Sequence, residues 1–145
     1  MQRRRYYFFA VLIISLAMGC NAQKIKHMET SEIKTLGYSD GNGNFYKITR
    51  DSIMYKPVSK EMSSSGIYSG GEAAQKKITA EDFKTIQEQF VTIFKNKKIH
   101  ITQRMKTSGM LIITYSNLTE KKIIIKKSEE MEQLELLLAE LLEIN

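Results

Sequence analysis

The chain of 145 residues contains a single cysteine, Cys20, which follows directly after an apolar N-terminal stretch. One thiol has no partner within the chain for a disulfide, and a cysteine zinc site needs several thiolate ligands. This chain therefore cannot be stabilised by an internal disulfide or by a cysteine zinc site. The fold must be held by its apolar core alone.

Residues 1–19 have the pattern of a secretory signal peptide. Positions 3–5 are arginines, and an apolar run of eleven residues, Tyr6–Leu16, follows them before a short stretch rich in small residues. The run is too short to cross a bilayer as a helix, which needs roughly 20 residues. The pattern predicts that residues 1–19 are removed during export.

The residues just before and at the cysteine, LAMGC at positions 16–20, resemble the lipobox of bacterial lipoproteins. The resemblance implies that Cys20 carries diacylglycerol on its sulfur and an acyl chain on its new amino group. It places the chain among the many short lipoproteins of the bacterial cell envelope whose role is unknown. It also implies the outer membrane, because Asn21 replaces the aspartate that retains many lipoproteins at the inner membrane, and the periplasmic side of it, because no acidic cluster follows Cys20.

The same residues leave a second cleavage site open. Cys20 and Ala22 could be the two small residues of an ordinary signal-peptidase site, with cleavage just after Ala22. The product would then be a soluble periplasmic or secreted protein. In both cases Cys20 takes no part in active-site chemistry.

Composition and charge predict one domain that does not bind nucleic acid. Residues 20–31 are polar and predict a tether, and residues 32–145 have the length of a single domain. Removing residues 3–5 lowers the 22 basic residues to 19, against 16 acidic ones. These charges are mixed along the chain and form no basic stripe with interleaved aromatic residues, which nucleic-acid binding would require.

Hydrophobic periodicity predicts an α+β domain: an antiparallel sheet of five or six strands with two helices packed on one face. Thr79 and Asp82 predict a capping box at the start of the first helix, and Ser128 predicts the cap of the second. Runs of β-branched and aromatic residues between turn signals predict the strands. These are Ile33–Tyr38, Phe45–Thr49, Ser52–Val58, Ile99–Met105, Met110–Tyr115 and Lys121–Lys127.

The segment Ser59–Gly71 is poor in apolar residues and predicts a long loop. Long loops in compact domains usually have a function, so we interpret part of this one as a recognition loop that presents Ile67 and Tyr68 to a partner. The alternative is a flexible connection. The candidate residues are Ser65, Gly66, Ile67, Tyr68, Ser69, Gly70 and Gly71.

Catalytic, metal and cofactor motifs are weak in this sequence, and we predict no catalytic residue, no metal site and no cofactor. The alternation of Asp40, Asn42 and Asn44 has calcium-loop spacing, but Phe45 stands where the sharp-turn glycine is needed, so a hairpin turn is the better interpretation. His27 lies in the tether. His100, between two isoleucines of a predicted strand, should point to the exposed face.

The second half of the chain has a faint likeness to emfourin-type inhibitors of bacterial metallopeptidases. The matching points are the pair Gly70-Gly71 before a helix, Tyr115, and the leucine stripe from Leu134 to Leu142. The resemblance implies an inhibitor as an alternative function. Our main prediction is a non-catalytic envelope lipoprotein that is bound to the membrane by its N-terminal lipid and binds a protein or another envelope component.

Overall fold

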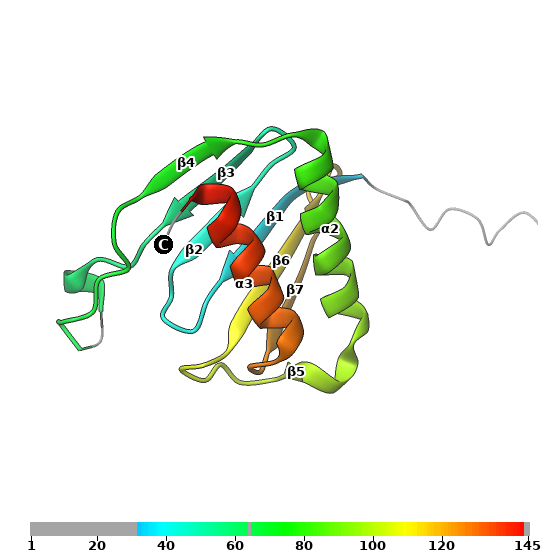
Figure 1. The fold of residues 1–145 in the computed structure, drawn as a ribbon. Coiled ribbons are helices and arrows are strands. Elements are labelled where there is room, and N and C mark those ends of the chain that lie inside the picture. The colour runs from blue at the N-terminus through cyan, green and yellow to red at the C-terminus, as the bar shows by residue number, and fades with distance from the viewer. Residues whose placement is uncertain (1–31, 64, 144–145) are drawn as a thin grey trace, which may run out of the picture. The chain divides into compact units, whose positions relative to one another are not determined.

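A computed structural model describes residues 32–63 and 65–143 of the chain. The predictions for the signal peptide, for Cys20 and for the tether 20–31 lie outside the described residues. Within them the fold is α+β, with a seven-stranded antiparallel sheet and two α-helices that lie on one face of it (Figure 1). The predicted fold class is confirmed, with one strand more than the upper number expected.

The strands follow one another as β1 (Ile33–Ser39), β2 (Phe45–Ile48), β3 (Ser52–Lys56), β4 (Ala74–Lys77), β5 (His100–Ile101), β6 (Gly109–Tyr115) and β7 (Glu120–Ile125). The helices are α2 (Ala80–Lys95) and α3 (Glu129–Leu142), with the short 3₁₀ helices η1 (Lys60–Met62) and η2 (Lys97–Ile99). Across the sheet the order is β4-β3-β2-β1-β6-β7-β5, and all neighbours are antiparallel.

Both long helices begin at the predicted caps. Thr79 Oγ1 accepts a hydrogen bond from the Asp82 backbone N–H at 3.1 Å, and the Asp82 carboxylate accepts one from the Thr79 N–H at 2.8 Å. Ser128 Oγ accepts from the Met131 N–H at 3.3 Å. Each cap satisfies backbone donors that the helix itself leaves unpaired, which stabilises a helix by about 1 kcal/mol.

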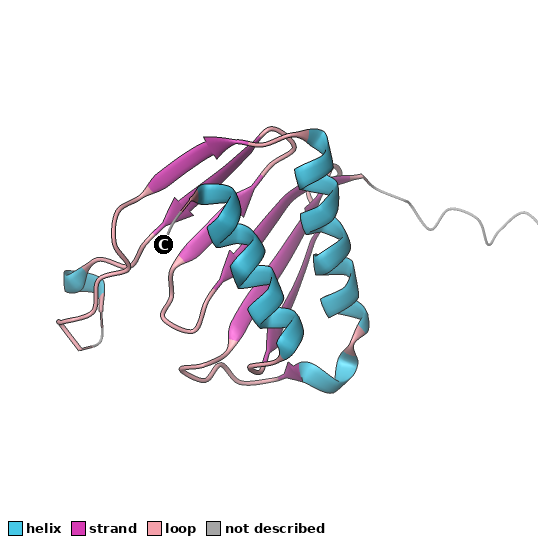
Figure 2. Cartoon of the chain, viewed as in Figure 1, coloured by secondary structure: helices cyan, strands magenta, loops and turns pink. Residues whose placement is uncertain are grey.

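The core lies between the helices and the face of the sheet that they cover (Figure 2). Alternate residues of the central strands point into it, and the apolar stripes of the two helices meet them there. The fully buried side chains include the following members of this core: Leu36, Tyr38, Ile48, Ile53, Ile86, Phe90, Ile93, Leu111, Ile125, Leu134 and Leu138.

The unpredicted strand is β4, at one edge of the sheet. Its sequence, Ala-Gln-Lys-Lys, lacks the β-branched and aromatic residues that mark strands, and three of its four side chains are exposed. It pairs with β3 through Ser52↔Lys77 to Tyr55↔Ala74. Lysines on a short edge strand discourage pairing with a further chain, so this composition suits its position.

The opposite edge corrects the prediction of a strand over Ile99–Met105. Only His100 and Ile101 pair with β7, since Lys97–Ile99 forms η2 and the chain leaves the sheet after Ile101. The following loop is held elsewhere, because the Arg104 guanidinium donates to Ser39 Oγ at 2.8 Å and to the Asp40 carbonyl at 2.7 Å.

The predicted direction of His100 is also wrong. Its Nε2 lies 3.0 Å from the carbonyl oxygen of Ile93 in α2, so the ring points to the helix side of the sheet and is half-buried. The neighbouring Ile99 is buried in η2 rather than in a strand. The alternation rule failed because the regular strand is too short to impose it.

Candidate functional site

The recognition loop predicted from sequence lies within the connection from β3 to β4, residues 57–73. In Figure 2 this connection, with η1, extends away from the sheet beyond the ends of its strands. Its base is fixed by three sets of hydrogen bonds, to Asn44, to Tyr55 and within the loop itself. The segment is therefore a projecting loop whose base is held by these hydrogen bonds.

Asn44 is the centre of this base and is almost fully buried. Its Oδ1 accepts from the Val58 backbone N–H at 3.0 Å, and its Nδ2 donates to the Tyr68 hydroxyl at 2.8 Å and to Asp40 Oδ2 at 2.7 Å. One side chain of the β1–β2 turn thus binds both arms of the loop. Buried amides of this kind are costly to leave unpaired, so the arrangement specifies the conformation of the loop base.

Gly70 completes the base. Its N–H donates to the Val58 carbonyl at 3.0 Å, and its carbonyl accepts from the Tyr55 hydroxyl at 2.7 Å. A Cβ atom at this position would overlap Asn44 Oδ1. Only glycine allows the loop to approach Asn44 this closely.

The outer part of the loop is exposed and partly apolar. Ile67 is 81% exposed and Met62 is 77% exposed, both far more than is usual for large apolar side chains. A hollow of about 410 Å³ lies between the loop and the β1–β2 turn, and its lining includes Met62, Tyr68 and Lys106. These features can accept an apolar group of a partner beside polar backbone.

Within the predicted recognition loop the structure separates two roles. Ile67 points outward as expected, whereas Tyr68 is half-buried and its hydroxyl is engaged by Asn44. Ser65 and Ser69 accept hydrogen bonds from backbone N–H groups two residues further on, which shapes the turn. Ile67 and Met62 are thus the exposed apolar side chains of the loop, whereas Tyr68 is part of its base.

The calcium-type spacing has a different explanation in the structure. Asp40 Oδ1 accepts from the backbone N–H groups of Asn42 and Asn44, each at 2.9 Å, and its Oδ2 accepts from the Asn44 side chain. These bonds occupy the carboxylate in forming the turn. Among the residues that the structure describes, no group of three or more metal-ligating side chains is close enough to hold an ion.

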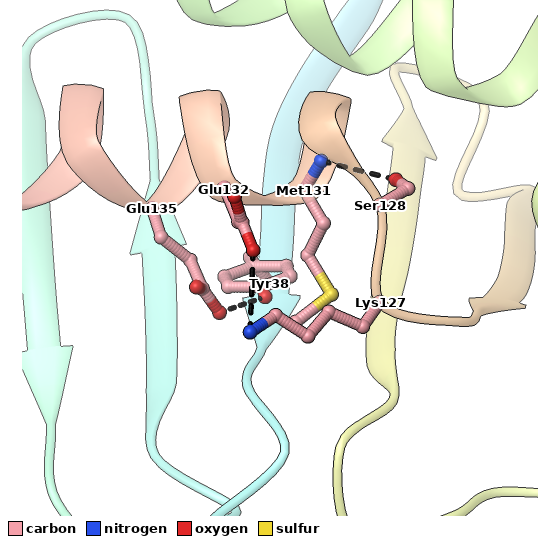
Figure 3. Close-up of polar contacts among 6 residues, drawn as sticks. All are labelled: Tyr38, Lys127, Ser128, Met131, Glu132 and Glu135. Atoms are coloured by element: carbon pink, nitrogen blue, oxygen red, sulfur yellow. Dashed lines mark hydrogen bonds and ion pairs between the residues drawn. The ribbon is translucent and has the colours of Figure 1, made fainter.

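A second polar cluster lies under α3. Tyr38, Tyr46 and Tyr55 occupy paired positions on β1, β2 and β3, with ring centroids 5.9 Å and 4.8 Å apart. The Tyr38 hydroxyl donates to Glu135 Oε1 at 2.6 Å, and Figure 3 shows this contact beside the ion pair of Lys127 with Glu132. The row of tyrosines therefore connects the loop base, through Tyr55, to the helix.

Burial sets the electrostatics of this cluster. Desolvation, with a smaller contribution from the hydrogen bond to Glu135, raises the pKa of Tyr38 far above its usual value. Desolvation also raises the pKa of Glu135, although the Tyr38 hydrogen bond opposes that shift. Both groups are weaker acids here than in water, and Tyr38 is fully buried. The pair serves as a strong structural contact.

Sequence reasoning missed Asn44, Tyr55 and Glu135. The sequence around Asn44 indicates a turn, and the bonds of Asn44 to Val58 and Tyr68 depend on chain segments that lie far from it in sequence. One tyrosine in each of three successive predicted strands is the available sequence signal for the row. Nothing local marks Glu135 within an acidic helix.

A comparison with known protein families found no match, and comparisons with curated proteins and with solved structures found none either. Neither α2 nor α3, nor any other helix in the described ranges, combines the length and apolarity that crossing a bilayer requires.

Proposed function

We propose that this chain is an exported lipoprotein of the outer membrane, held there by lipid on Cys20, whose domain binds a protein of the envelope. The observation that carries the binding role is the loop between β3 and β4, which presents Ile67 and Met62 on a base fixed by Asn44. Preorganised loops bind with a smaller loss of conformational entropy. The domain acts as a non-catalytic binder.

The anchor is supported by the LAMGC sequence at positions 16–20. Cys20→Ala should abolish incorporation of labelled palmitate and release the chain from the membrane fraction. Two or more acyl chains hold a protein in a bilayer nearly permanently, at about 0.8 kcal/mol per buried methylene, so the variant, unlike the parent chain, should leave the membrane in a high-salt wash. Labelling that persists in the variant would contradict the assignment.

The loop should contact the partner directly. A photo-crosslinking amino acid at position 67 should give a defined adduct in native envelopes, because that side chain is 81% exposed at the loop surface. The same amino acid at position 84, exposed on α2, provides the matched control and should give no such adduct. An adduct of the same size and yield from position 84 would contradict a specific contact between the loop and the partner.

A second candidate function is inhibition of a bacterial metallopeptidase. It is favoured by the same loop, since a projecting segment with a fixed base and an exposed apolar residue is what an inhibitor offers to a protease cleft. The purified chain should then slow a thermolysin-like peptidase at micromolar concentration, and Ile67→Asp should remove the effect while leaving the fold intact. A peptidase that keeps its full rate would exclude this function.

A further inference from the structure

The face of the sheet opposite the helices carries a distinctive set of side chains. Because successive side chains of a strand point to opposite faces of the sheet, the strand register shows which residues lie side by side on this face. In one row across the sheet, Lys56 of β3 lies opposite Phe45 of β2, and Met110 of β6 lies opposite Ile124 of β7. In the next row the corresponding pairs are Met54 with Lys47 and Ile112 with Lys122. No helix of the described chain covers this face (Figure 1).

The centre of this face is apolar and shallow. Gly37 has no side chain, and the Phe45 ring and Ile112 close over it, since a Cβ there would lie 3.2 Å from the Phe45 ring. Around them lies an open hollow of about 420 Å³ whose lining includes Lys47 and Leu118. Met54 is 42% exposed and Leu118 is 70% exposed. A monomer gains nothing from exposing these groups to water.

The charges around this centre are mainly positive, with one exposed carboxylate, Glu120, at its end. Lys47, Lys56 and Lys122 project from it, and Glu120 at its end is engaged by the Thr114 hydroxyl at 3.2 Å. The two helices on the other face are acidic on balance, because α3 carries five glutamates and no basic residue and α2 carries three acidic residues against two lysines. The fold therefore has a basic, apolar side and an acidic side.

We propose that this basic sheet face lies on the anionic phospholipid surface to which the chain is anchored. Charge complementarity favours phosphate headgroups over neutral surfaces, and lysines near such a surface contribute individually to binding. The eleven residues between Cys20 and Glu32 span at most about 40 Å when fully extended, so an anchored domain stays beside the bilayer. This tether argument rests on the proposed anchor, whereas the charge argument does not.

The place where the tether joins the domain agrees with this orientation. The Glu32 carbonyl accepts from the Ser116 N–H at 2.8 Å, so the chain enters beside the β6–β7 turn that exposes Leu118. An apolar side chain near the anchor can enter the headgroup region first. The helix face would then be directed away from the bilayer.

The test uses the mature chain with Cys20→Ala, which has no lipid, so its outcome is independent of the anchor. It should sediment with vesicles of phosphatidylcholine and phosphatidylglycerol, and much less with phosphatidylcholine alone. Raising the ionic strength from about 0.01 M to about 0.15 M shortens the screening length from about 30 Å to about 8 Å and should weaken binding. Lys47→Glu with Lys122→Glu should lower the partition coefficient at least about tenfold.

Two further variants make the test specific to this face. Lys84→Glu with Lys95→Glu changes the net charge equally on the exposed side of α2 and should leave most of the binding. Leu118→Asn removes the apolar side chain from a position with φ 65°, which asparagine accepts readily, and should weaken binding without unfolding the domain. Equal losses in the two lysine pairs, or no preference for phosphatidylglycerol, would overturn the proposal.

Discussion

Leu134→Ala should lower the free energy of unfolding by about 2–5 kcal/mol. Leu134 lies in the middle of α3, is fully buried, and belongs to the core cluster between this helix and the sheet. Removing its three distal carbons takes away apolar contacts and leaves a cavity that the neighbouring β-branched residues can fill only in part. Urea unfolding followed by circular dichroism measures the change. With no disulfide to limit the unfolded chain, a loss of this size would be a large part of the total stability.

Leu136→Ala is the control for this experiment. It makes the same chemical change two residues further along the same helix, where the side chain is 70% exposed. Helix propensity changes equally in both variants, so the difference between them reports burial alone. We expect Leu136→Ala to stay within about 0.5 kcal/mol of the parent chain. Similar losses in both variants would show that α3 is not packed as described.

The second large effect should appear at alkaline pH. The pKa of Tyr38 in the folded chain is raised by burial and by the hydrogen bond to Glu135, whereas an unfolded tyrosine has its usual value of 10.0. Above that pH the unfolded chain loses a proton that the folded chain keeps, so ionisation favours unfolding. The contribution of Tyr38 to stability should be constant below about pH 9 and should fall by about 1.4 kcal/mol per pH unit above pH 10. Tyr46 and Tyr55, whose pKa values burial also raises, add to the slope.

Urea unfolding at several pH values from about 9 to about 11.5 measures this slope. Tyr38→Phe should start from a lower stability, because Glu135 loses its donor, but should show a slope smaller by about 1.4 kcal/mol per pH unit. The lost hydrogen bond lowers the stability equally at every pH, whereas the change in the slope of stability against pH reports the ionisation of the Tyr38 phenol alone. An unchanged slope would mean that Tyr38 ionises as readily in the folded chain as in water.

The parts of the fold that the sequence predicted are those encoded by local pattern. The capping box of Thr79 and Asp82, the Ser128 cap and the spacing of buried residues in α3 depend on positions three or four residues apart, and all are present. The strands rich in isoleucine and tyrosine were found for the same reason. The fold class followed from these elements.

The parts that the sequence did not predict depend on contacts between distant segments. β4 exists because β3 offers it a partner, despite its strand-poor composition. The strand predicted at Ile99–Met105 is shorter than expected because Arg104 forms hydrogen bonds with Ser39 and Asp40. No local sequence pattern indicates these bonds. At the candidate site, the predicted loop Ser59–Gly71 falls two residues short of the observed connection at each end. Its attachment to Asn44 was not predicted, because that residue lies in the turn between β1 and β2.

The central position of β1 has a consequence for how the chain reaches its native state. Among the described strands β1 is synthesised before the others, and one of its neighbours, β2, follows at once, whereas on the other side Leu36 must wait for Ile113 of β6. Pairing two strands that lie so far apart in the sequence is slow. Until β6 pairs with β1, the free edge of β1 exposes unpaired backbone N–H and C=O groups to other chains. Shortened versions that end before β6 should therefore aggregate during expression, and the domain cannot be divided into two halves that mature separately.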